Sequence, residues 1–149
     1  MNRSYMANTV ETANKLFLDT GFLVALVVAD DQYHDRALEL ADQIEREERH
    51  VVTTRAVVAE IGDALASPGY RERAAKHIVA LQRSPTVDIA PLTEELFLRG
   101  FELYRERQDK SWGITDCISF VVMRERGLRE ALTTDSDFEQ AGFTALLTG

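Results

Sequence analysis

The sequence predicts an α/β protein, a three-layer α/β/α sandwich around a central, mostly parallel sheet of four to five strands. Short apolar runs of strand length alternate along the chain with longer segments of helical periodicity. The first such run, residues 16–18, leads directly through Asp19 into a second apolar run, as a buried strand does when a helix follows it. With 149 residues the chain is long enough for one compact core.

The expected elements follow from periodicity and from helix-capping residues. Thr54 and Thr93 each precede a helical segment, and Asp30 and Asp31 can cap the helix after them. The segment 114–123 is apolar on nearly every side, so we expect it to be the most buried helix. The expected strands are 15–18, 50–53, 86–90, 130–133 and 143–147; the expected helices are 22–28, 33–48, 55–65, 70–83, 94–107, 114–123 and a short one within 134–140. The expected buried stripe of the second helix is Ala37, Leu38, Ala41 and Ile44.

Composition is that of a globular protein, with 45% hydrophobic and 28% charged residues. The apolar run 22–29 is too short to span a bilayer, and residues 1–14 lack the apolar segment of a signal peptide. We therefore expect a cytoplasmic protein with a loosely ordered extension at 1–14 and a single domain at 15–149. The lone cysteine, Cys117, excludes an internal disulfide or a cysteine-based zinc cluster.

The net charge of −8 argues against broad contact with a phosphate backbone. Either the excess acid keeps the surface soluble, or part of it is a cluster that binds a divalent cation. Asp19 and Asp135 follow strands, whereas Glu60 and Asp116 lie near the starts of helices that should follow the same edge of the sheet. Four carboxylates that converge there would repel, and such a cluster calls for a hard cation such as Mg²⁺ or Mn²⁺.

Each of these acids also has an ordinary explanation. Asp19 can be an N-cap, Glu60 a solvated helix residue, and Asp135 a turn residue after a strand. Asp116 is the least easily explained in this way, because a carboxylate in the first turn of an apolar helix needs a partner. The basic residues near this edge are candidates for phosphate contacts or are simply solvated; they are Arg55, Arg107 and Lys110.

Four blocks of sequence, in this order, give the chain its resemblance to a known family. They are Leu18-Asp19-Thr20-Gly21-Phe22, Val57-Val58-Ala59-Glu60-Ile61, Trp112-Gly113-Ile114-Thr115-Asp116-Cys117-Ile118-Ser119-Phe120 and Leu132-Thr133-Thr134-Asp135-Ser136-Asp137-Phe138. From about Leu16 to Leu147 the chain resembles PIN-domain ribonucleases, particularly the VapC-like toxins of toxin-antitoxin pairs. The resemblance implies a catalytic metal site formed by Asp19, Glu60, Asp116 and Asp135, with hydroxyl groups from Thr20 and Thr115 beside it. Asp137 is a further candidate ligand, at a position where similar sequences often have a histidine.

The function that follows is a Mg²⁺- or Mn²⁺-dependent endoribonuclease that hydrolyses RNA phosphodiester bonds as the toxin of a toxin-antitoxin pair. The alternatives are an RNA-processing PIN-like nuclease that is not a toxin, and a catalytically silent PIN-like domain that binds a partner. Acyl-phosphate chemistry is disfavoured, because Asp19-Thr20-Gly21 lacks the second aspartate of a D-x-D motif. The resemblance also implies a homodimer and a small antitoxin partner. Four aromatic residues are candidates either for such an interface or for the core, namely Phe97, Phe101, Tyr104 and Trp112.

Overall fold

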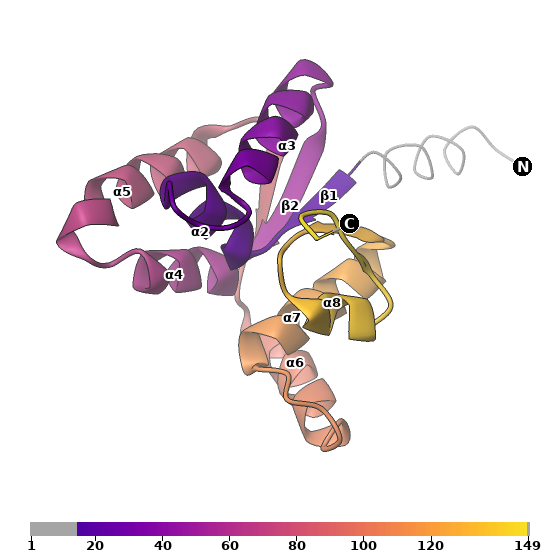
Figure 1. Cartoon of the computed structure of the whole chain (residues 1–149). Helices are drawn as coiled ribbons and strands as arrows, with labels where there is room; N and C mark the ends of the chain where they lie inside the picture. Colours follow the sequence, from indigo (N-terminus) through magenta and orange to yellow (C-terminus); the bar gives the residue numbers. More distant parts are fainter. Residues whose placement is uncertain (1–14, 149) are drawn as a thin grey trace, which may run out of the picture.

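The computed structural model of the protein describes residues 15–148, so the expected extension at 1–14 lies outside the described residues (Figure 1). Strands and helices alternate as expected. The strands are β1 (Lys15–Leu18), β2 (His50–Thr54), β3 (Val87–Ala90), β4 (Glu130–Leu132) and β5 (Thr144–Ala145). The helices are α2 (Thr20–Val27), α3 (His34–Arg46), α4 (Arg55–Ala64), α5 (Pro68–Arg83), α6 (Glu94–Glu106), α7 (Ile114–Arg126) and α8 (Ser136–Gln140).

The five strands form one sheet in the order β3-β2-β1-β4-β5, and every neighbouring pair is parallel. The predicted fold class is confirmed. Strand β1 lies in the centre, where Phe17 is in register with Val52 of β2 on one side and with Ala131 of β4 on the other. A central strand of a parallel sheet is covered on both faces, which explains why residues 16–18 are apolar without alternation and almost fully buried.

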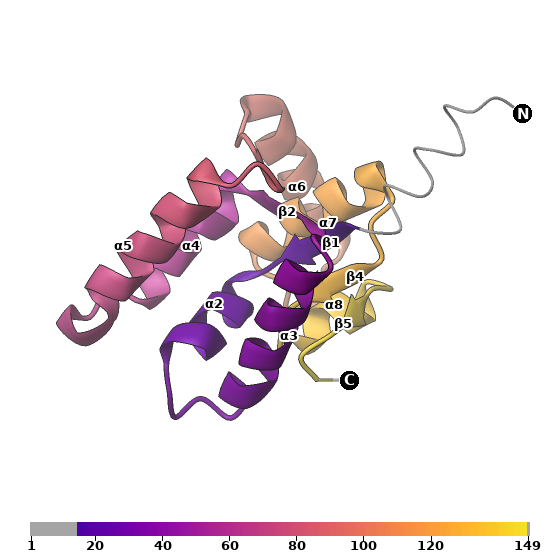
Figure 2. The ribbon, with the colours of Figure 1, turned by 90° about the horizontal axis from the view of Figure 1, so that it is seen from above.

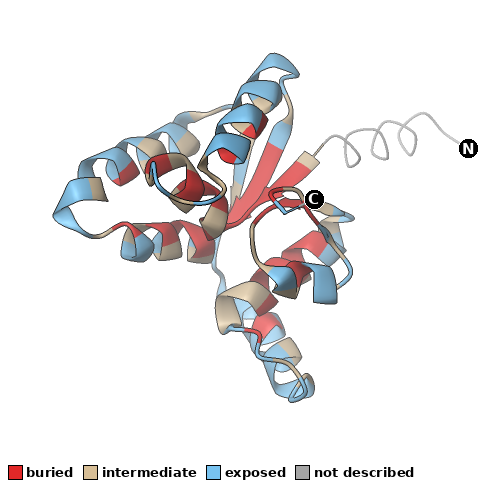
Figure 3. Cartoon of the chain, in the orientation of Figure 1, coloured by how far each residue is buried: buried red, intermediate tan, exposed pale blue. Residues whose placement is uncertain are grey.

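Helices cover both faces of the sheet. Figure 2 shows α6 and α7 on one face and α2 and α3 on the other, while α4 and α5 lie side by side at one end. Buried residues concentrate in the strands and on the inner sides of these helices (Figure 3). Helix α7 has six buried residues, which are Cys117, Ile118, Ser119, Phe120, Val122 and Met123. The expectation that it is the most buried helix is wrong by share of length, because five of the eight residues of α2 are buried and none is exposed. No helix in the described part of the chain is both long and apolar enough to cross a membrane.

Two of the predicted helix caps are confirmed. The hydroxyl oxygens of Thr54 and Thr93 accept hydrogen bonds of 3.1 Å from the N–H groups three residues later, at the starts of α4 and α6. The prediction for α3 is wrong at its start, because Tyr33 occupies the N-cap position and Asp31 instead accepts a hydrogen bond of 2.8 Å from the Tyr33 N–H in the preceding turn.

The apolar stripe of α3 is also predicted wrongly at one position. Leu38 is 48% exposed, whereas Leu40, which is not part of the expected stripe, is buried. Ala37, Leu40 and Ile44 repeat at intervals of three and four and face the core, so the true stripe is rotated away from Leu38.

Helices α6 and α7 approach each other closely at Gly100. This glycine is buried, and a Cβ atom there would lie 2.5 Å from the Ile118 Cγ1 and 3.2 Å from the Ile118 backbone N and Cα atoms. Because the obstacle includes backbone of α7, a side chain at this position would push the two helices apart. The lack of a side chain at residue 100 therefore allows the close approach of α6 to α7. Helix α7 is the helix that carries Asp116.

We expect Gly100→Ala to lower the free energy of unfolding by about 1 to 3 kcal/mol, although alanine is the better helix former by about 1 kcal/mol. Gly62→Ala in α4 is the matched control, since its added Cβ would meet only the Ile78 Cδ1 at 4.0 Å. That control should be neutral or slightly stabilising in urea titrations. Equal stability of the two variants would show that the helices separate without cost.

Candidate active site

The carboxyl ends of β1 and β4 lie next to each other and bring two aspartates to one edge of the sheet. Asp19 directly follows β1, and its N–H donates a hydrogen bond of 3.1 Å to the carbonyl oxygen of Leu132, the last residue of β4. Asp135 follows Leu132 by three residues. Parallel α/β sheets bind their ligands at this edge, because the loops that follow the strands all open there.

The carboxylate of Asp19 is held by a hydrogen bond from Thr133, the residue that follows β4. Its carboxylate Oδ2 accepts a hydrogen bond of 2.7 Å from the Thr133 hydroxyl, and the residue is only 5% exposed. Asp19 does occupy the N-cap position of α2, but its side chain makes no capping hydrogen bond there. Burial raises the pKa of Asp19 from 3.8 to about 6; the Thr133 and Thr20 hydrogen bonds oppose this rise, and the nearby carboxylates of Glu60 and Asp135 add to it.

Thr133 is a site residue that the sequence analysis missed. It is completely buried, and while its hydroxyl donates to Asp19, the same oxygen accepts a hydrogen bond of 3.0 Å from the Asp135 N–H. One side chain therefore positions two of the acids. The sequence does place a threonine at the end of a buried strand, and a buried hydroxyl group must find hydrogen-bond partners. This pattern alone does not identify those partners.

Asp116 lies in the first turn of α7. Its Oδ2 accepts a hydrogen bond of 3.3 Å from the Gly113 N–H, and Gly113 is the N-cap residue of this helix. Burial raises the pKa of Asp116 from 3.8 to about 7, with further contributions from the carboxylates of Asp135, Asp19 and Asp137, in that order.

Three carboxylates form the compact part of the site. Asp116, Asp135 and Asp137 each offer an oxygen atom, and these atoms all lie within 4.8 Å of one another. Asp135 is the N-cap residue of α8, where its carboxylate accepts a hydrogen bond of 2.9 Å from the Asp137 N–H. Burial and the neighbouring Asp135 raise the pKa of Asp137. All the donors are carboxylate oxygens, so this cluster suits a hard divalent cation and does not suit zinc.

Glu60 lies beside this cluster and is joined to it through Asp19. Its Oε1 accepts a hydrogen bond of 2.5 Å from the Thr20 hydroxyl, which links α4 to the first turn of α2. Of the two threonines proposed to support the acids, Thr20 thus contacts one of them. Within residues 15–148, no hydrogen bond joins the Thr115 side chain to a carboxylate; the Thr115 backbone carbonyl accepts one from Ser119.

Gly21 allows the loop after β4 to approach α2. A Cβ atom at residue 21 would lie 2.8 Å from the Thr134 Oγ1 and 3.5 Å from the Thr134 backbone N, so a side chain there would require the Thr134 hydroxyl to move. Cys117 follows Asp116 in α7. It is buried, as expected for a small core residue, and burial raises the pKa of its thiol to about 11.

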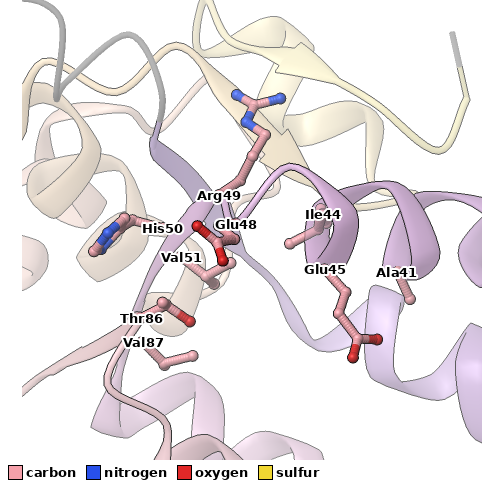
Figure 4. A pocket seen from close by; sticks show the side chains of 9 residues that line it. All are labelled: Ala41, Ile44, Glu45, Glu48, Arg49, His50, Val51, Thr86 and Val87. Carbon is pink, nitrogen blue, oxygen red and sulfur yellow. The ribbon is translucent and has the colours of Figure 1, made fainter.

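A pocket of about 550 Å³ opens at the opposite edge of the sheet, where β2 and β3 begin (Figure 4). Figure 4 shows Arg49 extending away from Thr86 and Val87, and its guanidinium lies 3.6 Å from the Glu130 carboxylate. The residues that line the pocket are Ala41, Ile44, Glu45, Glu48, Arg49, His50, Val51, Thr86 and Val87. None of the predicted site residues lies among them, so this pocket is separate from the carboxylate cluster.

Comparisons with known proteins agree with this arrangement. The sequence profile of the PIN domain matches residues 16–144. A protein of Mycobacterium tuberculosis named 23S rRNA-specific endonuclease VapC20, found in two strains, is 30% identical over 128 residues, which cover 86% of this chain and 95% of that protein. The crystal structure of M. tuberculosis VapC20, described as a toxin that cleaves the sarcin-ricin loop, matches with a TM-score of 0.73 and 29% identity over 87% of this chain and 96% of that one. The chain therefore belongs to the PIN-domain family, and within it to the VapC-like proteins.

Proposed function

We propose that this protein is an endoribonuclease that hydrolyses RNA phosphodiester bonds with the help of Mg²⁺ or Mn²⁺. The observation that carries the proposal is the convergence of Asp116, Asp135 and Asp137 at the carboxyl edge of the sheet, with their oxygens within 4.8 Å of one another. Because its relative is named for the 23S rRNA, a sarcin-ricin stem-loop is the first substrate to test.

The protein's own residues divide the work between holding a cation and keeping the carboxylates in place. Asp116, Asp135, Asp137 and Asp19 would hold the cation, with Glu60 beside them. A divalent cation bound there would lower the pKa of a water molecule and neutralise charge on the phosphodiester. Thr133 fixes the orientation of the Asp19 carboxylate through its hydrogen bond to Oδ2. Asp116, with its pKa near 7, holds a proton in part when no cation is present and releases it when one binds.

We also propose that the protein acts as the toxin of a toxin-antitoxin pair. The named activity of its relative supports this role, and ribosomal RNA as the target would place the action in the cytoplasm. A short neighbouring reading frame that encodes a DNA-binding protein would supply the antitoxin. An isolated gene would instead favour an RNA-processing role for the same catalytic site.

Cleavage should depend on the metal and on Asp116. Purified protein should cut the stem-loop RNA with Mg²⁺ or Mn²⁺ and stop when EDTA is added. Loss of a hydrogen bond that orients a metal ligand costs roughly 10- to 100-fold in metal affinity or activity, so changing a direct ligand by Asp116→Asn should lower the single-turnover rate by about 100-fold or more. Asp42→Asn, on the exposed face of α3, is the control and should cleave normally. Cleavage that persists in EDTA would exclude the proposed mechanism.

The stability of the metal-free protein should fall as the pH rises from about 4 to 7. A carboxyl group whose pKa is higher in the folded state than in the unfolded chain stabilises the fold while it is protonated, and this contribution is lost when it ionises. For Asp19, with a pKa raised from 3.8 to about 6, the loss is about 3 kcal/mol. Asp19→Asn should flatten the pH profile and be more stable than wild type at pH 8 in EDTA.

Thermal unfolding of wild type and Asp19→Asn, measured in EDTA and in Mn²⁺, distinguishes a metal-binding Asp19 from one that only caps a helix. Wild-type protein should gain about 2.7 kcal/mol at a hundredfold excess of Mn²⁺ over its Kd, and Asp19→Asn should gain less. If Asp19 were only an N-cap residue, Asp19→Asn would be no more stable than wild type in EDTA and Mn²⁺ would change neither protein.

We propose further that a second copy of the chain covers the exposed aromatic face of α6. Phe97, Phe101 and Tyr104 follow one another along this helix, with ring centroids 6.4 and 6.3 Å apart, and all three are exposed. Trp112 differs from them, since it is 4% exposed and packs against Phe120 in the core. The three α6 aromatics with exposed Leu98 are therefore the apolar surface available to a partner.

A charge in the middle of this surface should prevent dimerisation. Phe101→Glu should give a monomer by light scattering at micromolar concentration, where wild type should be a dimer, because a carboxylate would have to be desolvated at the interface. Val79→Glu places the same charge at an exposed apolar residue of α5 and should leave the dimer intact. A monomeric wild type would remove this proposal without affecting the proposed nuclease activity.

A further inference from the structure

The carboxylate cluster poses an electrostatic problem for an RNA substrate. Asp19, Glu60, Asp116, Asp135 and Asp137 gather at one edge of the sheet, and one divalent cation does not balance five carboxylates. A phosphodiester that approaches this edge is itself negative. A cationic side chain beside the cluster would lower the cost of that approach.

The loop between α6 and α7 brings one lysine to this position. Trp112 fixes the loop, because its ring packs edge-on against Phe120 at 5.0 Å between centroids and its Nε1–H donates a hydrogen bond of 3.3 Å to Gln140 at the end of α8. The same helix α8 carries Asp137 in its first turn. Lys110 stands two residues before Trp112, and its N–H donates a hydrogen bond of 3.1 Å to the Arg107 carbonyl oxygen, which closes a turn. The loop that carries Lys110 is thus attached to the helix that carries Asp137.

Lys110 also acts electrostatically on the cluster. Its positive charge opposes the rise in the pKa of Asp137 that burial and Asp135 cause. For Asp19 and Asp116, the other site residues whose pKa values shift, the charged neighbours responsible are carboxylates. Of the site residues whose pKa values shift, Asp137 is the one for which a cation, Lys110, is among the causes.

The two other basic candidates are engaged elsewhere. The guanidinium of Arg107 donates hydrogen bonds of 3.0 and 3.1 Å to the two carboxylate oxygens of Asp109 and lies over the Trp112 ring, 5.0 Å from its centroid. Arg55 donates a hydrogen bond of 2.7 Å to the Gln82 side chain. The Lys110 ammonium has only a distant ion pair, 4.0 Å from the Asp109 Oδ2, and its side chain is 26% exposed. It is the candidate whose charged group can move to a ligand at least cost.

We propose that Lys110 is an RNA-binding residue that contacts a phosphate of the substrate backbone as the RNA enters the carboxylate cluster. This inference rests on the proposed nuclease function. A lysine suits the task because its ammonium is a compact charge with three donors and can follow a phosphate oxygen without a fixed geometry. The contact forms with the bound RNA and persists through cleavage, so it contributes to RNA binding and not to the chemical step.

Three variants and a salt titration test the proposal. Lys110→Met removes the positive charge and keeps most of the aliphatic length of the side chain, whereas Lys110→Arg keeps the charge. Lys76→Met is the control, since Lys76 is an exposed lysine of α5. Lys110→Met should raise the KM and the Kd for the stem-loop RNA by about tenfold and leave kcat nearly unchanged, as expected for a contact made equally in the ground and transition states. Lys110→Arg should bind like wild type.

The dependence of binding on salt identifies the contact as one to a phosphate. Loss of one phosphate contact should reduce the slope of log Kd against log salt by about 0.7 to 0.9, and Lys76→Met should not change it. The Mn²⁺-induced shift in melting temperature should be no smaller in Lys110→Met than in wild type, because Lys110 does not hold the cation and its positive charge opposes cation binding. A lower Mn²⁺ response in Lys110→Met would show that the residue supports the metal site, and would overturn the proposal.

The same measurements distinguish failure of this inference from failure of the proposed function. If wild type cleaves RNA and Lys110→Met has the same Kd and salt slope as wild type, Lys110 is not a phosphate contact. If wild type binds RNA without cleaving it, but Lys110→Met still loses affinity and salt slope, the nuclease proposal fails and the phosphate contact stands. If wild type neither cleaves nor binds RNA, both are wrong.

Discussion

Repulsion among carboxylates at the carboxyl edge of the sheet is the constraint on which the site depends. Two unit charges 4.8 Å apart repel by roughly 3 to 4 kcal/mol at an effective dielectric constant of about 20. Asp116, Asp135 and Asp137 make three such pairs, so full ionisation of all three would cost on the order of 10 kcal/mol. That is comparable with the whole stability of a typical domain. Either protons or a cation must therefore compensate the cluster. In agreement, the pKa values of Asp116 and Asp137 are raised, mainly by burial and further by the neighbouring carboxylates.

The fold counters this repulsion with hydrogen bonds to particular carboxylate oxygens and with a rigid frame. Thr133 binds Asp19, Thr20 binds Glu60, and the Asp137 N–H binds Asp135. Each of these bonds to a charged acceptor contributes on the order of 1.5 to 3 kcal/mol. The frame is equally necessary, because a cluster that repels would otherwise spread apart. Aromatic packing of Phe138 against Phe120, with ring centroids 4.9 Å apart, holds α8 against α7 and prevents this.

The sequence predicted the sheet, its parallel strands and most helix boundaries, because those features depend on local periodicity and capping. Thr54 is an example, since its role as the N-cap residue of α4 can be predicted from the helical segment that directly follows it. Leu38 shows the limit of this reasoning. Apolar residues of α3 outnumber those that one face can bury, and only the packing of α3 against its neighbours decides that Leu40, not Leu38, lies inside.

Proximity within the site was less predictable than the identity of its acids. The positions of Asp19 and Asp135 after strands are visible in the sequence, but the distance between Asp116 and Asp137 depends on how α8 packs against α7. Thr133 escaped notice for the same reason: its partners, Asp19 and the Asp135 N–H, come from different segments. Because the chain carries a net charge of −8, its overall charge does not favour long-range attraction of RNA. Cations beside the carboxylate cluster therefore matter more for RNA affinity than the charge of the whole surface.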